Sequence, residues 1–354
     1  MSPGRDCRLI RVVRLCALSV AACLVVSAAV RVALKVFVPD NFVFSVKAER
    51  AAEDPELNVV FLGTSRIAYG VIPEVFDRTM DRGGVGGIHS YNVADGGESV
   101  LEAIADAETL FNLRPHGVKF VLFEPDLTSQ LIIREPDSAR AIEFFTVPHA
   151  FLAIRFMNFP VRTPGPAIST VDYVGNIIAA TLRHYSNIGL ARAEPDPPDP
   201  TISATSRGYS DLDDRIRRPM PIDELYERYL ASVRQIGTRP RPELISDDHL
   251  NLILSLASFI ESKGAIPILI RPPQEASWDF ADAFAAKFEQ RCAGKRPLFF
   301  NFGSPQEYGE LYASWNRWDS DHLNAAGATI FSTLIAKRLA RAIRDDTYSR
   351  PLCD

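Results

Sequence analysis

Five short apolar runs recur along the chain, and each is closely followed by glycine or proline. They cover residues 58–62, 90–94, 119–123, 266–270 and 298–301. Short uninterrupted apolar runs bounded by turn residues are typical of strands buried on both faces, as in parallel sheets. The pattern therefore predicts a parallel sheet of about five strands.

Stretches with helical spacing of apolar residues lie between these runs. The predicted helices cover residues 99–113, 248–263, 279–292 and 324–344. In the last of them Ile330, Leu334 and Leu339 follow the helical repeat, and Asn324 is the expected N-cap. Strands that alternate with helices predict a layered α/β domain, in which ligands bind at the carboxyl ends of the strands.

One connection is much longer than a parallel crossover requires. Between the third and fourth predicted strands lies an insertion at residues 127–265. Residues 144–159 are apolar and aromatic, whereas residues 193–221 are rich in proline, aspartate, serine and arginine. Two interpretations stay open: a lid or substrate-binding cap that includes a mobile loop, or a disordered connection with a few packed helices.

The N-terminal segment has the charge pattern of a membrane anchor. Four arginines, at positions 5, 8, 11 and 14, precede an apolar run at residues 15–30. The run is slightly shorter than the roughly 20 residues of a usual span, but residues 9–13 can extend it inward. Because arginines flank the cytoplasmic end of such helices, we expect a single-pass protein of the inner membrane. Residues 1–40 would form the cytoplasmic N-terminus and the anchor, and residues 41–354 a periplasmic, extracytoplasmic domain.

Two alternatives for this segment stay open. A cleaved signal peptide has the same charged start and a short apolar core. The stretch Val20–Cys23 also resembles a bacterial lipobox, which would make Cys23 a lipidated N-terminus. All three interpretations export the rest of the chain.

Composition narrows the classes of function. The chain has 354 residues and a net charge of −5, so it offers no basic surface for nucleic acid. Of the five cysteines only Cys292 and Cys353 lie in the predicted domain, and whether they pair is left open. The absence of a CxxC pair argues against a zinc ribbon or a thioredoxin-like site.

The first candidate motif is Gly63–Arg66, directly after the first predicted strand. A serine at a strand-to-helix turn presents its hydroxyl at the edge of the sheet. Its backbone N–H can face a developing oxyanion there. Ser65 is therefore a candidate nucleophile.

The second motif is Asp319–Asn324, just before the final predicted helix. A serine needs a base, and histidine suits this task near neutral pH. The spacing of three residues allows the Asp319 carboxylate to reach the Nδ1–H of His322 and to fix its tautomer. Asp321 is the alternative partner, but it is adjacent to the histidine and would tend to point elsewhere.

Together the two motifs resemble the SGNH (GDSL-like) hydrolase superfamily. The matching features are Gly-x-Ser after the first strand, a glycine-rich turn after the second and Asp-x-x-His before the last helix. The resemblance spans residues 59–343, and the layout is similar to the membrane-anchored, cell-envelope branch. It implies a flavodoxin-like three-layer α/β/α sandwich and acyl-ester chemistry without a metal or other cofactor.

The resemblance also assigns roles to single residues. Ser65 matches the nucleophile, and His322 and Asp319 match the base and the residue that orients it. Gly97 matches the glycine whose N–H helps to form the oxyanion hole, with Gly96 as the substitute if the turn is shifted by one residue.

One element departs from the family's pattern. The superfamily supplies an asparagine donor after the third strand, where this chain has Phe123–Asp126. Proline has no N–H, and ionised acidic side chains only accept hydrogen bonds. Losing one oxyanion donor costs about 10²–10³-fold in rate. We therefore expect a slow or partner-assisted transferase rather than an efficient general esterase.

Further residues border the predicted site. Arg66 can bind an anionic substrate group or pair with Glu98 or Glu124, and the ion pair is favoured. Arg271 can contact substrate or belong to a structural turn. For Trp315, core packing is favoured over support of a sugar ring.

The expected function is a serine-dependent hydrolase or O-acyltransferase that acts on acylated cell-envelope glycan. Its expected partners are an acyl donor, the membrane and a membrane acyltransferase. A non-catalytic binding or scaffold protein of the same fold is the alternative, motivated by the missing asparagine. A third hypothesis is a metal-dependent phosphoesterase that uses Asp319, Asp321 and His322.

Overall fold

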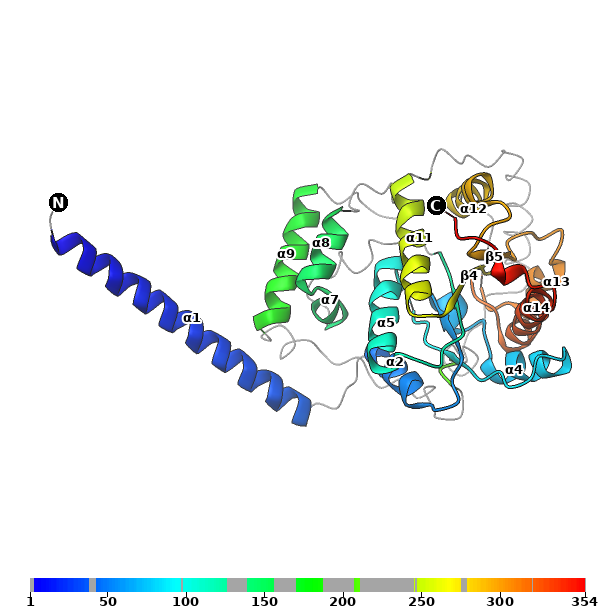
Figure 1. The fold of residues 1–354 in the computed structure, drawn as a ribbon, viewed down its shortest axis with the longest axis horizontal. Coiled ribbons are helices and arrows are strands. Elements are labelled where there is room, and N and C mark those ends of the chain that lie inside the picture. Colours follow the sequence, from blue (N-terminus) through cyan, green and yellow to red (C-terminus); the bar gives the residue numbers. More distant parts are fainter. Residues whose placement is uncertain are drawn as a thin grey trace. The chain divides into compact units, whose positions relative to one another are not determined.

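The computed structural model describes residues 3–37, 43–96, 98–125, 139–155, 170–186, 207–210, 245, 247–274, 279–319 and 321–353. The chain forms two compact units (Figure 1). The first contains α1 (Pro3–Phe37), α7 (Ala139–Phe144), α8 (Val147–Arg155) and α9 (Thr170–Ser186). The second contains the sheet and the remaining helices.

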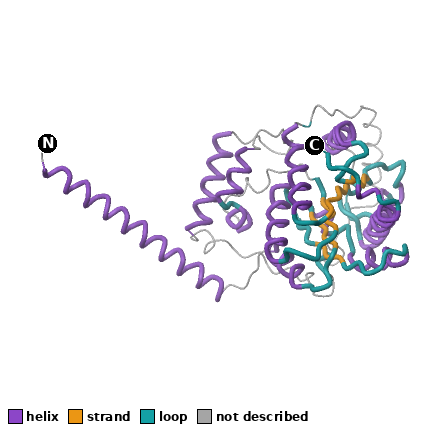
Figure 2. Tube along the Cα trace, viewed as in Figure 1, coloured by secondary structure: helices purple, strands orange, loops and turns teal. Residues whose placement is uncertain are grey.

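A single parallel sheet forms the centre of the second unit (Figure 2). Its strands are β1 (Val59–Leu62), β2 (Ser90–Asn92), β3 (Phe120–Phe123), β4 (Ile266–Arg271) and β5 (Leu298–Asn301). They lie in the order β2-β1-β3-β4-β5, and every neighbouring pair is parallel. This is the strand order of flavodoxin-like folds, so the predicted fold class is confirmed.

The helices of the second unit follow the predicted alternation with the strands. They are α2 (Val43–Glu53), α3 (Ser65–Ala68), α4 (Pro73–Arg82), α5 (Val100–Leu113), α11 (Asp247–Ser262), α12 (Asp279–Cys292), α13 (Gly309–Tyr312) and α14 (Ala325–Arg344), with the 3₁₀ turns η2 (Ser314–Asn316) and η3 (Thr347–Ser349). The predicted helices correspond to α5, α11, α12 and α14. Sequence reasoning did not identify α2, α3, α4 or the helices of the insertion.

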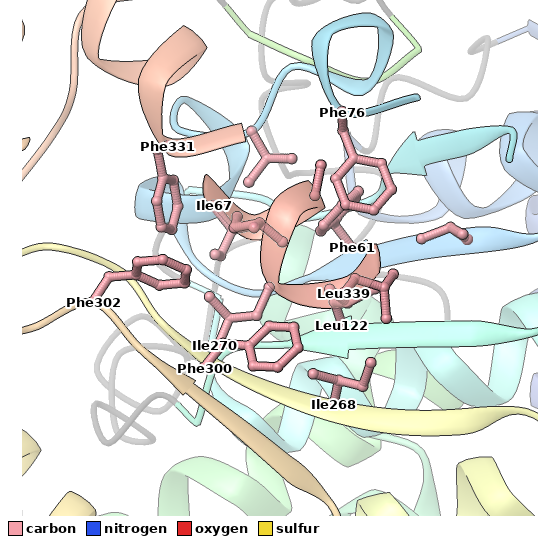
Figure 3. Packing of buried hydrophobic residues seen from close by; sticks show 14 of the residues in the cluster. Phe61, Ile67, Phe76, Leu122, Ile268, Ile270, Phe300, Phe302, Phe331 and Leu339 are labelled. Atoms are coloured by element: carbon pink, nitrogen blue, oxygen red, sulfur yellow. The ribbon is translucent and has the colours of Figure 1, made fainter. Parts of the chain in front are cut away.

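Side chains alternate between the two faces of the sheet, and each face is covered by helices. Phe61 of β1 and Leu122 of β3 face α4 and α14, where Phe76, Phe331 and Leu339 complete a buried core (Figure 3). On the other face α5 packs on β1 and α11 packs on β4. The result is the expected three-layer α/β/α arrangement.

Two helix starts are fixed by side-chain caps, of which the sequence analysis identified the one at Asn324. The Asn324 side chain accepts from the Gly327 N–H at 3.0 Å, which confirms it as the N-cap of α14. Ser99 and Glu102 form a capping box at the start of α5, because each side chain accepts from the other residue's backbone N–H.

A disulfide joins Cys292 at the end of α12 to Cys353 near the C-terminus. Beside it the Arg296 N–H donates to Pro351 O at 2.8 Å, and the Cys353 N–H donates to Arg296 O at 2.7 Å. The C-terminal segment is therefore held against the residues that lead into β5.

The insertion is described only in part. Of the loop predicted at residues 193–221, only residues 207–210 lie within the described part of the chain. They lie along β2, because the Asn92 N–H donates to Arg207 O at 2.9 Å. Gly208 has φ +84°, and a Cβ there would lie 1.9 Å from Asn92 O, so only glycine fits this approach. The Ser210 N–H donates to Ala68 O at 3.2 Å, which joins the insertion to α3.

The N-terminal helix has the composition of a membrane span. Within α1, Val12–Val30 forms a 19-residue stretch of mean hydropathy 2.2 that is long and apolar enough to cross a bilayer. By length and composition it fits an anchor or a signal sequence.

A buried histidine makes a prediction about acid stability. His249 of α11 is buried, and burial lowers its pKa from 6.5 to about 4. Between these values the unfolded chain binds a proton that the folded chain excludes, so stability falls as pH falls from 6.5 towards 4. The loss integrates to about 3 kcal/mol. We expect His249→Phe to flatten this part of the stability profile, measured by denaturant unfolding of the full chain in detergent at several pH values.

The matched control is His116→Gln, because His116 is exposed. It should leave the slope unchanged. An unchanged slope in His249→Phe would show that the buried imidazole is not the source of the acid lability.

Candidate active site

Ser65 stands at the first turn after β1. Between strand and helix, Gly63 has φ +146°, and a Cβ there would lie 2.8 Å from Glu124 Cβ, so glycine is required. Thr64 is the N-cap of α3, and its hydroxyl accepts from the Arg66 N–H at 3.2 Å. Ile67 anchors the same short helix in the core (Figure 3). This turn therefore holds Ser65 at the carboxyl edge of the sheet, next to the β1–β3 pair where the chain switches direction.

His322 and Asp319 meet Ser65 from the other end of the chain. His322 Nε2 lies 2.8 Å from Ser65 Oγ. His322 Nδ1 lies 2.9 Å from both carboxylate oxygens of Asp319. Because an ionised carboxylate only accepts, the Nδ1–H of His322 donates to Asp319, and the tautomer protonated at Nδ1 places Nε2 as the acceptor for the serine hydroxyl. The structure thus brings together the three residues that the sequence proposed as nucleophile, base and orienter.

The Asp319 carboxylate is held by its own turn. Its Oδ1 accepts the backbone N–H groups of Asp321 and His322, each at 2.8 Å. Burial raises the pKa of Asp319, but the hydrogen bonds and charge of His322 and these two N–H groups outweigh it and leave the pKa below its usual value. Asp319 is therefore ionised at neutral pH, as an orienter of imidazole must be. Asp321, the alternative partner, contributes its N–H to Asp319.

Glu124 occupies the position after β3 where the family's pattern has an asparagine donor. Its side chain is 4% exposed. Oε2 accepts the Thr64 N–H at 3.1 Å and the Thr64 hydroxyl at 2.8 Å, and Oε1 accepts Arg66 Nε at 2.7 Å. Glu124 thus binds the residues on both sides of Ser65 and holds the turn that carries it.

Arg66 joins three strand ends. It pairs with Glu124 at 2.7 Å, which is one of the two ion pairs that the sequence allowed. Its Nη1 also donates to Gln274 Oε1, at 2.8 Å, in the segment after β4. The turns after β1, β3 and β4 are therefore tied together directly beside Ser65.

Asn92 supports α3 from the strand on the other side. This β2 residue is fully buried, and its Nδ2 donates to Ile67 O and Val71 O, each at 2.9 Å. These bonds tie β2 to α3 and to the turn that follows it. Sequence reasoning treated Asn92 only as part of a strand.

The glycine-rich turn after β2 lies against the Ser65 turn. The Asp95 N–H donates to Gly63 O at 3.0 Å. The Gly96 N–H donates to the Asp95 carboxylate at 2.7 Å, so this donor is engaged within its own turn. Gly97, the expected oxyanion donor, lies outside the described residues.

Tyr69 is a further residue of the site that the sequence did not reveal. Its ring packs edge-on against the His322 ring, with the centroids 5.5 Å apart. A Cβ on Gly96 would lie 3.8 Å from the Tyr69 hydroxyl oxygen. Tyr69 follows Ser65 by four residues, one helical turn, and this spacing is the signal that could have identified it.

The structure favours one of the two interpretations of Arg271 and contradicts the expectation for Trp315. Arg271 is 7% exposed and pairs with Asp282 at 2.6 Å, which favours its structural interpretation. The expectation that Trp315 packs in the core is wrong, because its side chain is 70% exposed. Trp315 lies in the 3₁₀ turn η2. Its backbone O accepts a hydrogen bond from Asn324 Nδ2 at 2.8 Å.

The described residues offer no metal centre. Among them, no group of three His, Cys, Asp or Glu side chains is arranged to hold an ion. Asp319 and His322 bind each other, and the remaining ring nitrogen faces Ser65. The metal-dependent hypothesis gains no support from this geometry.

The role of Glu124 can be tested with a neutral isostere. Glu124→Gln leaves Arg66 without its buried counter-charge, which should destabilise the fold by about 3 kcal/mol. The matched control is Glu74→Gln, whose carboxylate is 41% exposed and pairs with Arg207 at 3.1 Å. That change should cost less than about 1 kcal/mol. Both are measured by denaturant unfolding in detergent, and equal losses would contradict the role given to Glu124.

Comparison with known proteins assigns no family to this chain. No protein-family model matches it, and no curated protein matches it. Any proposal about its function therefore rests on its own residues and their geometry.

Proposed function

We propose that this chain is a serine-dependent enzyme of SGNH type, a hydrolase or O-acyltransferase that acts on acyl esters of cell-envelope glycan. The observation that carries the proposal is the hydrogen-bonded series Asp319–His322–Ser65, with contacts of 2.9 and 2.8 Å. Ser65 and His322 are 257 positions apart in the chain, so their contact is a product of the fold. Such a series is the arrangement that activates a serine hydroxyl.

The first half of the reaction acylates the serine. Ser65 Oγ attacks the carbonyl carbon of the ester while its proton passes to His322 Nε2. The C–O bond of the ester then breaks, and the leaving alcohol takes the proton from His322. Asp319 stabilises the imidazolium that exists between these two transfers.

The second half removes the acyl group. Water or a sugar hydroxyl gives its proton to His322 Nε2 and attacks the acyl-serine carbonyl. Ser65 leaves with the proton from His322. Water yields a carboxylic acid, and a sugar hydroxyl yields a new ester, so the same residues support hydrolysis and transfer.

Oxyanion stabilisation limits the rate in this proposal. Within the described residues the Ser65 N–H donates to no acceptor, so it can bind the oxyanion. The resemblance to SGNH hydrolases assigns the second N–H to Gly97, which lies outside the described residues. Glu124 accepts hydrogen bonds where the family has a donor. With two oxyanion donors, we expect either slow turnover or an enzyme whose partner presents the acyl group.

The substrate class is supported by Trp315. An indole that is 70% exposed in the turn next to Asn324 offers an apolar face to a sugar ring. Export of the catalytic unit would bring it to such a glycan. We propose that α1 is an inner-membrane anchor with the arginine-rich end in the cytoplasm and the second unit outside.

A non-catalytic binding protein is the competing proposal. The observation that favours it is Glu124 in place of the asparagine donor. In this case Ser65 and His322 would remain hydrogen-bonded without reacting. The two proposals differ in whether Ser65 forms a covalent acyl intermediate.

The series of three residues predicts a graded loss of turnover. We expect Ser65→Ala and His322→Ala to reduce hydrolysis of a chromogenic acetyl ester to background. Asp319→Asn should reduce it by about 10⁴-fold, because an amide cannot hold the same tautomer. Asp321→Asn is the matched control and should stay within a few-fold of the wild type. Initial rates are measured on the full-length protein in detergent, and unchanged turnover in Ser65→Ala would rule out this mechanism.

If Trp315 stacks on a sugar ring, its loss should affect the kinetics of a sugar substrate but not those of a small ester. Trp315→Ala should raise KM for an acetylated oligosaccharide about three- to tenfold through the loss of ring stacking. The kcat/KM for a small acetyl ester should stay unchanged, because that substrate has no sugar ring. Equal effects on both substrates, or on neither, would argue against a sugar-binding role.

A further inference from the structure

Two helices of the first unit leave apolar side chains uncovered. We define the α8–α9 apolar surface by its exposed members Val147, Phe151, Val171, Ile178, Leu182 and Tyr185. Phe151 is 71% exposed and Val171 is 81% exposed. Single exposed apolar residues are common, but a group of this size on neighbouring helices indicates an interaction surface.

On α9 the exposed apolar side chains form a stripe along one face of the helix, opposite the buried face. Val171, Ile178, Leu182 and Tyr185 follow the helical repeat along one face. The opposite face of α9 is already buried, and it is fixed by hydrogen bonds: Tyr173 donates to Ala153 O at 3.3 Å, and His184 Nδ1 lies 2.8 Å from Ile142 O. Figure 1 shows α7, α8 and α9 side by side. α9 is therefore apolar on both faces, and within the described part of the chain only one of them packs against protein.

A hydrogen bond between α1 and α9 shows which position along α1 lies beside this surface. The hydroxyl of Ser27 donates to Tyr185 O at 2.8 Å, in the last turn of α9. Among the side chains at positions 12 to 29, all are exposed except that of Ser27. The apolar stretch of α1 thus meets α9 at one point and is uncovered along the rest of its length.

That point lies inside the segment that can cross a membrane. The segment ends at Val30, three residues after Ser27, which corresponds to about 4.5 Å along the helix axis. Tyr185 is therefore level with the boundary between acyl chains and headgroups, where tyrosine is enriched. Leu182 lies one helical turn before it. The exposed stripe therefore begins at a depth where a helix in a bilayer contacts lipid.

We propose that the α8–α9 apolar surface lies in the bilayer that α1 crosses, at the acyl-chain boundary of the leaflet where α1 ends. The proposal depends on α1 being the anchor proposed above, and it is independent of the serine chemistry. Lipid is favoured over a protein partner or a second copy because the Ser27–Tyr185 contact makes the surface continuous with the lipid-facing side of α1. Helices with an apolar face lie about 5–10 Å deep in this boundary.

Spin labels can measure this depth in the full-length protein. Phe151→Cys and Leu182→Cys are labelled in a background in which the three N-terminal cysteines are serine. Val20→Cys reports on the anchor itself. Leu113→Cys is the matched control, because this leucine is 55% exposed at the end of α5 in the second unit. The proteins are reconstituted in vesicles of phosphatidylcholine and phosphatidylglycerol, and collisions with oxygen and with a water-soluble nickel chelate are compared.

The proposal predicts that labels at 151, 182 and 20 collide with the chelate roughly tenfold less often than the label at 113, since polar solutes are excluded from acyl chains. Collisions with oxygen should rise at the same three positions. Free access of the chelate to 151 and 182, with 20 protected, would overturn the proposal while leaving the anchor intact. Access to 20 as well would overturn the anchor. Dipolar broadening at 182 that vanishes on dilution with unlabelled protein would show that a second copy covers the surface, and would also overturn the proposal.

Discussion

The carboxylate of Glu124 is buried at the end of β3, and the turn that carries Ser65 is built around it. The N–H and the hydroxyl of Thr64 and the guanidinium of Arg66 all donate to its two oxygens. A buried carboxylate is tolerated only when it is paired and hydrogen-bonded, so each side of this contact requires the other. Arg66 also donates a hydrogen bond to Gln274 after β4. Through Arg66 the ends of β1, β3 and β4 are therefore joined at the edge of the sheet that carries Ser65.

Glu124 also bears on the proposed acyl-transfer chemistry. Glu124 accepts hydrogen bonds where the SGNH pattern has an asparagine donor. Under the proposed mechanism, the residue that holds the serine turn therefore leaves one fewer group to stabilise an oxyanion. The series that the proposal depends on is nevertheless in place: Asp319 holds His322, and His322 faces Ser65. If Ser65 is activated as we propose, weak oxyanion stabilisation would fit transfer from a presented acyl donor better than rapid hydrolysis of many esters.

Much of this fold could be predicted from local pattern. The five strands, four of the helices, the N-cap at Asn324 and the spacing of Asp319 and His322 depend on residues close in sequence. The Arg66–Glu124 ion pair was among those that the sequence allowed, and Tyr69 lies one helical turn after Ser65. The contacts of Glu124 with Thr64 and of Asn92 with Ile67 could not be predicted in this way, because they join distant segments. Trp315 was assigned to the core because aromatic residues usually are, and neighbouring sequence does not reveal which face of a 3₁₀ turn is left open.

Covalent labelling of Ser65 tests the central claim most directly. The full-length protein in detergent is treated with a fluorophosphonate, and the modified peptide is identified by mass spectrometry. The account predicts one phosphonylated residue, Ser65, and loss of the adduct in His322→Ala while the variant stays folded. A folded wild-type protein with no adduct at Ser65 would contradict it and would leave the chain as a binding protein of the same fold.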